Sequence, residues 1–379
     1  MRPQVIEPSL RIGVAGLGYW GPNLARNFAA LPGCELAWCC DASEAARARE
    51  GPRFPGARFT DRLEDLLCDP ALDAVSLATP VPTHADLAVR VLEAGKHCFV
   101  EKPLAQSVAD AERVVAAAEA AGRVLMVGHL LEYHPGIGEL KELTSSGELG
   151  ERIYYIYGNR LNLGKLRADE NALWSLGAHD VSVVLHLAEE EPVEAVAHGE
   201  SYVRDGVQDV VFCFLRFPSG LSAHLHLSWL DPHKERRFTV VGSRRMATFD
   251  DMAIEGKLTV YDKGFDEDAN SYGEYITRTG GSFSPPIPNV EPLRVECQHF
   301  VECVRTGARP RSDGASGLRV VRVLEELQRS LAESPGGDSA QSSVGGAKSG
   351  GALGAELSGG GGTVELPGGG GTAEQLGAS

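Results

Sequence analysis

The chain has 379 residues and a formal net charge of -16, with 43% hydrophobic and 23% charged residues. This composition is sufficient for two folded domains and excludes collagen, a coiled coil and a wholly disordered chain. Nucleic acid and anionic lipid are not expected as partners, because both bind positive surfaces and this chain is acidic without a clustered basic stretch. Glycine is concentrated at one end, where 16 of the 45 glycines lie in the 44 residues Gly336–Ser379.

Short apolar runs alternate with longer helical patterns from residue 10 to residue 131, which predicts a parallel sheet covered by helices. Nearly continuous apolar strands are typical of a sheet that is buried on both faces. The expected strands are 10–16, 35–40, 72–79, 96–100 and 124–128, and the expected helices are 20–31, 42–50, 61–67, 83–94 and 108–121. We therefore predict an α/β domain with a doubly wound parallel sheet, a Rossmann fold, over residues 1–131.

The pattern changes at about Arg152, where strand-like runs follow one another directly. Consecutive strands joined by short turns predict a large, mostly antiparallel sheet in a second domain of the α+β type, residues 132–334. Its expected strands are 152–161, 192–202, 209–217, 221–230, 236–243 and 246–251, and its expected helices are 135–145, 171–187, 293–305 and 315–332. The last two helices are expected to pack back onto the core. Residues 335–379 are too glycine-rich to form a core and are expected to be a disordered tail.

No apolar run reaches the roughly 18 residues that a membrane helix needs, and the first ten residues lack the apolar core of a signal peptide. We therefore expect no membrane partner and a cytoplasmic location. Eight cysteines without a CxxC pair favour reduced thiols over a zinc site or a disulfide framework. His224 and His226 alternate along one strand without a suitable third ligand nearby, so no metal site is predicted.

A GxGxxG motif at residues 16–21 directly follows a predicted strand and precedes a predicted helix. In such a turn Gly16 permits the sharp bend, Gly18 lets the backbone approach a pyrophosphate, and Gly21 allows close helix packing. The helix N-terminus then faces the phosphates with free N–H groups. Asp41 follows the second strand, 20 residues after Gly21, where a carboxylate can accept hydrogen bonds from the adenosine ribose. These features together predict a dinucleotide site.

The carboxylate of Asp41 bears on the choice of cofactor. It would repel the 2'-phosphate of NADP, which favours NAD; the alternative is that Asp41 only caps the helix that follows it. Other residues at the carboxyl edge of the sheet complete the predicted cofactor groove. The expected cofactor-binding residues are Gly16, Gly18, Tyr19, Trp20, Gly21, Asp41, Thr79, Pro80, His84, Glu101 and Lys102.

Two polar groups are candidates for catalysis. Lys102 follows the strand 96–100 at the edge where ligands of open α/β sheets bind, and a lysine there can donate to a substrate hydroxyl or share its proton. His179 lies in the helix 171–187, and a histidine can take a proton from an alcohol at neutral pH, with Asp180 or a neighbour to orient it. A surface lysine and a structural histidine are the alternatives that spacing alone leaves open.

Arg160, Lys165 and Arg167 form a basic cluster before that helix, with Asn162 and Asn171 nearby. Such groups suit a uronate carboxylate or a sugar diphosphate, because guanidinium groups pair with both in a bidentate manner. The alternative is a salt-bridged strand end, with partners among Glu151, Asp169 and Glu170.

These segments together resemble the Gfo/Idh/MocA family, the glucose-fructose oxidoreductase and inositol dehydrogenase group. The resemblance covers about residues 10 to 330 and rests on GLGYWGPNLARNF, EKP, GHLLEYHPGI, NRLNLGKLRADENALWSLGAHD and PLRVECQHFVECVRTGARPRSDG. Within the family, the segments NRLNLGK and LWSLGAHD are most similar to those of bacterial nucleotide-sugar 3-dehydrogenases. Those enzymes oxidise the C3 hydroxyl of UDP-N-acetylglucosamine or its uronic acid in surface polysaccharide biosynthesis.

The resemblance implies that Lys102 hydrogen-bonds the reacting hydroxyl of a nucleotide sugar, that His179 removes its proton, and that the hydride passes to NAD. Many members carry an aspartate four residues before this histidine, where this chain has Ser175. The resemblance also implies a homo-dimer or homo-tetramer formed through the second sheet. The alternatives are another sugar or cyclitol dehydrogenase, a ketosugar reductase, an NAD-dependent glycosidase and a non-enzymatic sugar sensor, which would not need both Lys102 and His179.

Overall fold

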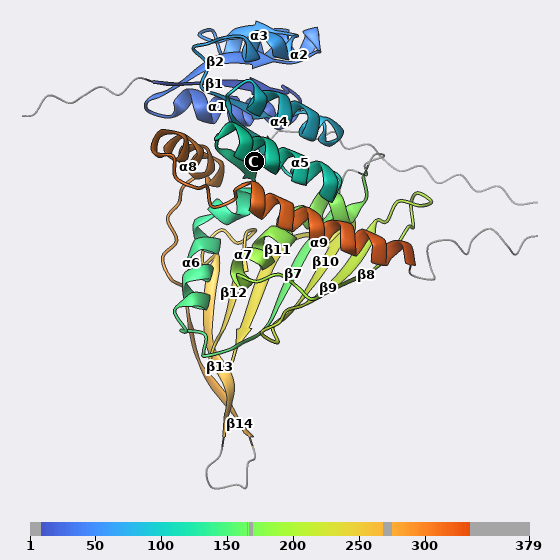
Figure 1. Ribbon diagram of the computed structural model, residues 1–379. Helices are drawn as coiled ribbons and strands as arrows, with labels where there is room; N and C mark the ends of the chain where they lie inside the picture. Colours follow the sequence, from blue (N-terminus) through green and yellow to red (C-terminus); the bar gives the residue numbers. More distant parts are fainter. Residues whose placement is uncertain (1–8, 165, 167–169, 268–274, 334–379) are drawn as a thin grey trace, which may run out of the picture. The chain divides into compact units, whose positions relative to one another are not determined.

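The computed structural model describes residues 9–164, 166, 170–267 and 275–333 (Figure 1). All of these residues fall within one compact unit. The predicted tail, residues 335–379, lies outside the described residues, and so do Lys165 and Arg167 of the basic cluster. None of the helices in the described part of the chain has the length and apolar character needed to cross a membrane.

The first sheet has six parallel strands in the order β3-β2-β1-β4-β5-β6, the order of a doubly wound Rossmann fold. Its strands are β1 (Leu10–Ala15), β2 (Cys34–Cys40), β3 (Arg58–Thr60), β4 (Ala74–Leu77), β5 (His97–Glu101) and β6 (Leu125–Gly128). Its helices are α1 (Gly21–Ala30), α2 (Glu44–Glu50), α3 (Leu63–Leu67), α4 (His84–Glu93) and α5 (Val108–Ala121). Every residue of β4 and β6 is buried, as continuous apolar strands require. The predicted Rossmann fold is confirmed, and β3 was missed because three residues carry no periodicity.

The second sheet has eight strands in the order β14-β13-β12-β11-β7-β10-β9-β8. The strands are β7 (Ile153–Leu163), β8 (Glu194–Glu200), β9 (Val210–Arg216), β10 (Ser222–Ser228), β11 (Leu230–Gly242), β12 (Met246–Asp250), β13 (Leu258–Glu267) and β14 (Tyr275–Phe283). Only the pair of β7 and β10 among these strands is parallel, so the prediction of a mostly antiparallel sheet is confirmed. Strands β13 and β14 were not predicted; the residues of β14 are almost all exposed, which removes the apolar alternation that marks a strand.

Helices cover one face of the second sheet (Figure 1). They are α6 (Pro135–Ser145), α7 (Ala178–Ala188) and α9 (Gly314–Glu333), with a π-helical turn, η4 (Leu173–Gly177), directly before α7. Two short 3₁₀ turns, η2 (Val81–Thr83) and η3 (Leu130–Tyr133), follow β4 and β6. Because η3 packs against α7, the carboxyl edge of the first sheet meets the start of the second domain.

Helix α8 (Pro292–Thr306) packs against α1 and shares the core beneath the first sheet. The ring of Phe300 lies edge-on to Phe28 and Phe99, with centroid distances of 6.2 and 5.6 Å. Helix α9 contacts α5 on one side and α7 and β8 on the other. The last two helices therefore return to the core, and α9 connects the two sheets.

Candidate functional site

The glycine loop between β1 and α1 leaves room for a ligand where a dinucleotide fold needs it. Gly16 has a φ of +95°, and a Cβ on it would lie 2.4 Å from the carbonyl oxygen of Ala78. A Cβ on Gly21 would lie 1.7 Å from the carbonyl oxygen of Gly16, so this position also requires glycine. A Cβ on Gly18, in contrast, would meet nothing within 4 Å. The open space beside Gly18 is where the pyrophosphate approaches the backbone in this motif, so the residues fit a dinucleotide.

Asp41 stands directly beside this loop. Its Oδ2 accepts a hydrogen bond from the backbone N–H of Leu17 at 2.6 Å, and its Oδ1 accepts from the N–H of Ser43 at 2.8 Å. The helix that follows begins at Glu44, and its N-cap is Ser43, whose Oγ accepts from Ala46. The alternative role of Asp41 as the cap is therefore taken by Ser43, and the carboxylate of Asp41 faces the glycine loop.

The other predicted cofactor residues lie on the neighbouring loops. Tyr19 is exposed and Trp20 hydrogen-bonds the side chain of Glu101. Thr79 and Pro80 lie between β4 and η2. Glu101 ends β5, and burial raises its pKa to about 7.

His84 is buried, and each of its ring nitrogens lies 2.9 Å from a backbone carbonyl oxygen. One carbonyl belongs to Thr79 after β4 and the other to Pro103 after β5. His84 therefore joins the two loops that carry the predicted cofactor residues, which is a positioning role.

Lys102 connects the two domains. Its Nζ donates a hydrogen bond to the backbone carbonyl of Ser175 at 3.0 Å. Ser175 lies in the π-helical turn η4, and His179 is the second residue of α7. The contact places Lys102 about one helical turn from His179, and the positive charge of Lys102 helps to lower the pKa of His179. π-Helical turns occur frequently at functional sites.

The surroundings of His179 favour the uncharged form of its imidazole. Burial, followed by the charges of Lys102 and Arg160, holds the pKa of His179 well below its ordinary value of 6.5. Its imidazole is therefore neutral at neutral pH, as a general base requires. Within the described residues, its buried Nδ1 has no hydrogen-bond partner, which leaves that nitrogen available to a ligand.

Asp180 forms a buried ion pair with Arg160 and does not orient His179. Arg160 of β7 donates from Nε to Oδ2 of Asp180, and both side chains are almost completely buried. Neither Oδ1 of Asp180 nor Nη2 of Arg160 has a partner among the residues that the structure describes. Arg160 thus forms a salt bridge, which was its alternative role, but the partner is Asp180 and not one of the expected acidic residues.

Arg236 is a further neighbour of this site and was not among the predicted site residues. It lies opposite Arg160 in the register of β11 and β7, and it contributes to the lowered pKa of His179. Its Nη1 also donates to Asp251 at 3.4 Å. Arg236 lies beside Arg160 because of the register between β11 and β7, and this register cannot be predicted from a local sequence motif.

The two predicted asparagines have different surroundings. The Oδ1 of Asn162 is buried without a hydrogen-bond partner in the described part of the chain. The Nδ2 of Asn171 donates to the side chains of Gln208 and Gln328, at 2.9 Å each, and its Oδ1 accepts from the N–H of Trp174. Asn162 can therefore still receive a ligand donor, whereas the amide of Asn171 holds the start of η4.

The two histidines considered for metal binding are packed on aromatic rings. His224 stacks on Tyr157 at a centroid distance of 5.3 Å, and His226 stacks on Phe212 at 4.4 Å. No group of three or more histidine, cysteine, aspartate or glutamate side chains in the described ranges is arranged to hold a metal ion.

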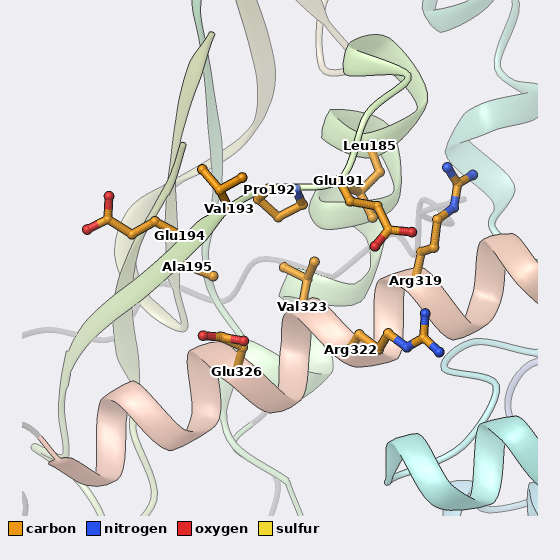
Figure 2. Close-up of a pocket in the computed structure, with 10 residues that line it drawn as sticks. All are labelled: Leu185, Glu191, Pro192, Val193, Glu194, Ala195, Arg319, Arg322, Val323 and Glu326. Atoms are coloured by element: carbon orange, nitrogen blue, oxygen red, sulfur yellow. The ribbon is translucent and has the colours of Figure 1, made fainter. Parts of the chain in front are cut away.

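A pocket elsewhere in the second domain lies between the start of β8 and helix α9 (Figure 2). Charged side chains line it, among them Glu191, Glu194, Arg319, Arg322 and Glu326. Arg322 is already paired with Glu112 at 2.9 Å. The pocket contains none of the predicted site residues, so it is separate from the cluster around Lys102 and His179.

A parallel sheet with a glycine loop at its carboxyl edge is the architecture of a dinucleotide-binding domain, and here a second domain with a large open sheet follows it. Residues 10–129 match the oxidoreductase family with an NAD-binding Rossmann fold, and residues 137–248 match the GFO/IDH/MocA C-terminal domain. The chain therefore belongs to the GFO/IDH/MocA family of NAD-binding oxidoreductases.

The chain is similar to several members over most of its length. It is 27% identical to scyllo-inositol 2-dehydrogenase (NAD(+)) of Bacillus subtilis, covering 80% of this chain and 89% of the relative. It is 28% identical to UDP-N-acetylglucosamine 3-dehydrogenase of Acidithiobacillus ferrooxidans, covering 84% and 96%; the solved structure of that enzyme superposes with a TM-score of 0.74. The NAD complex of GenD2 from gentamicin A biosynthesis, 25% identical, has a TM-score of 0.73 and coverage of 88% and 97%.

The glycine loop gives a direct test of the cofactor site. Gly18→Ala should fold normally, because the new Cβ meets no atom within 4 Å, but its Kd for NAD should rise by about 10-fold or more, since that space is needed by the pyrophosphate. Gly21→Ala should lose both thermal stability and NAD binding, because its Cβ collides with the backbone. NAD titration and thermal melting measure both effects.

Gly138→Ala is the matched control, because Gly138 lies in α6 with equally open space around it. It should bind NAD as the unmodified protein does. Wild-type NAD affinity in Gly18→Ala would contradict the placement of the pyrophosphate.

Proposed function

We propose that the protein, a sugar or cyclitol oxidoreductase, oxidises the C3 hydroxyl of UDP-N-acetylglucosamine or of its uronic acid, with NAD as the hydride acceptor. The observation that carries the proposal is the contact of Lys102 with the carbonyl of Ser175, which brings a lysine of the first domain close to His179 of the second. The similarity to UDP-N-acetylglucosamine 3-dehydrogenase supports this substrate. The similarity to scyllo-inositol 2-dehydrogenase favours a cyclitol as the second candidate.

In the proposed reaction, Lys102 donates a hydrogen bond to the reacting hydroxyl. Its positive charge stabilises the negative charge that develops on that oxygen as the proton departs. The neutral imidazole of His179 accepts the proton. NAD, when bound at the glycine loop, supplies the acceptor for the hydride that leaves the same carbon.

The anionic part of the substrate would bind beside this pair. Arg160 keeps its Nη2 available although its Nε is engaged by Asp180. Arg236 adds a second positive charge on the same face of the sheet. A uronate carboxylate or a diphosphate fits two guanidinium groups, and Lys165 and Arg167 stay proposed contributors that lie outside the described residues.

Substrate panels separate the alternatives. We expect reduced cofactor to accumulate when the protein is incubated with NAD and UDP-N-acetylglucosamine or its uronic acid, followed by absorbance. If the protein oxidises only scyllo-inositol, its substrate is a cyclitol and not a nucleotide sugar. Release of a leaving group without net reduced cofactor would identify a glycosidase, and reduction only of ketosugars would identify a reductase.

We also propose that NAD is preferred over NADP. In Asp41→Asn, the loss of the carboxylate should lower kcat/KM for NAD by about 10- to 100-fold, because a charged acceptor for the ribose hydroxyls is lost. The value for NADP should rise, because the repulsion of a 2'-phosphate is removed and Arg47 and Arg49 lie beside the loop. An unchanged ratio of the two kcat/KM values in a variant with unchanged melting temperature would refute this role.

The assembly through the second sheet stays a proposal. Its outer face exposes aromatic side chains on β7 and β9, among them Tyr155, Phe212 and Phe214. An exposed aromatic patch of this kind is typical of a surface that binds a partner, and a second copy of the chain is the partner that we propose.

A further inference from the structure

His129 is the first residue after β6, next to the strand that leads to Lys102. Strands β5 and β6 are parallel neighbours, and Glu101 at the end of one pairs with Gly128 at the end of the other. The next residue on each strand is Lys102 and His129, respectively. The two side chains therefore leave the same edge of the sheet from adjacent strands.

The imidazole of His129 is buried and has no hydrogen bond to any residue that the structure describes. Its exposed fraction is 0%, and within the described residues neither ring nitrogen has a partner. Two other buried histidines do have polar neighbours: each ring nitrogen of His84 lies 2.9 Å from a carbonyl oxygen, and Nδ1 of His134 accepts from Gly136. A buried polar group without a partner is costly, and a ligand group can supply the missing partner.

The surroundings of His129 identify the kind of ligand. The turn η3 that follows it packs against α7, the helix that carries His179. The charge of Lys102 lowers the pKa of His129, and His129 in turn contributes to the lowered pKa of His179. The three side chains are therefore near enough to interact electrostatically, and we treat them as one cluster. Burial, assisted by Lys102, lowers the pKa of His129 to about 3. A neutral imidazole offers one donor and one acceptor, and a hydroxyl can pair with either of them because it both donates and accepts.

We propose that His129 binds the substrate hydroxyl next to the carbon that is oxidised, and that it selects substrates with such a vicinal hydroxyl. The inference rests on the proposed oxidation of a sugar or cyclitol at Lys102 and His179. In this proposal Lys102 and His179 bind the reacting hydroxyl, and the uncharged imidazole of His129 binds the hydroxyl on the neighbouring carbon.

The experiment compares the wild-type protein with His129→Phe on two pairs of compounds. One pair is UDP-N-acetylglucosamine and its 4-deoxy analogue, and the other is scyllo-inositol and a deoxy derivative that lacks a neighbouring hydroxyl; the pair that the wild type oxidises is used. His129→Phe should lower kcat/KM for the complete substrate by about 10- to 100-fold and leave that for the deoxy analogue nearly unchanged.

Stability and cofactor binding show that the variant is folded. His129→Phe should melt at the wild-type temperature or higher, because it removes an unsatisfied polar group from a buried position, and its Kd for NAD should not change. His186→Phe is the control, since His186 is a partly buried histidine further along α7. It should keep the wild-type preference for the complete substrate.

Three results would overturn the proposal. An equal loss of kcat/KM on both members of a pair would show that His129 does not contact the vicinal hydroxyl. A higher Kd for NAD in His129→Phe would indicate that the imidazole binds the nicotinamide carboxamide instead. Absence of wild-type activity on every sugar and cyclitol would refute the proposed function and, with it, this inference. The first two results would refute only the role of His129 and would not contradict the proposed function.

Discussion

His179→Ala and Lys102→Ala should each lower kcat by about 10²- to 10⁴-fold while NAD binding persists, because a general base and its electrostatic partner contribute in that range. Neither side chain touches the glycine loop in the proposed mechanism, so both variants should still bind NAD in a titration. Lys141→Ala on α6, which breaks an ion pair with Glu189, is the control and should keep wild-type turnover. Turnover close to wild type in both variants would contradict the assignment.

The pH dependence of kcat/KM is a second test of the role of His179 as the base. The wild-type kcat/KM should fall only below pH 6.5, because burial and the charges of Lys102 and Arg160 lower the pKa of His179 from that value. Lys102→Ala removes one of these positive charges, so the pKa of His179 should rise and the acidic limb should move to higher pH. A limb that stays in place would mean that a group other than His179 titrates.

Asp180→Ala should lower the free energy of unfolding by about 3 to 5 kcal/mol, because it leaves the buried guanidinium of Arg160 without its carboxylate. The pair has almost no solvent access, so water cannot replace the lost partner. Urea unfolding of the cofactor-free protein measures this loss.

The exposed pair of Arg216 and Glu194 is the matched control, since both of its side chains are about half exposed. Glu194→Ala should cost at most about 1 kcal/mol. The double variant Arg160→Met with Asp180→Leu should recover much of the loss, because an apolar pair of similar size needs no charge partner. Equal losses in Asp180→Ala and Glu194→Ala would show that burial does not control the energy of the pair.

Most of the fold could be predicted because it depends on local periodicity. Buried strands such as 74–77 and the glycine motif at 16–21 carry strong signals over a few residues. The missed strands lack that signal: 58–60 is too short, and 275–283 is exposed almost throughout. The last two helices were predicted from their spacing, but not which sheet each one covers, because that depends on contacts across the whole chain.

The candidate site could be predicted only in part, because a motif names residues and not their partners. Lys102 and His179 stand out by their place after a strand and near the start of a helix. The carbonyl of Ser175 and the pairing of Arg160 with Asp180 follow from how the two domains meet. Arg236 reaches the site through strand register alone, which sequence spacing does not report.

The return of α8 to the first sheet has a consequence for how the protein is made. Phe28 and Phe99 emerge early from the ribosome, whereas Phe300, which completes their core, is synthesised after the whole second sheet. Domains usually fold in order of synthesis. Here the core of the nucleotide-binding half is complete only after almost all of the chain has been translated.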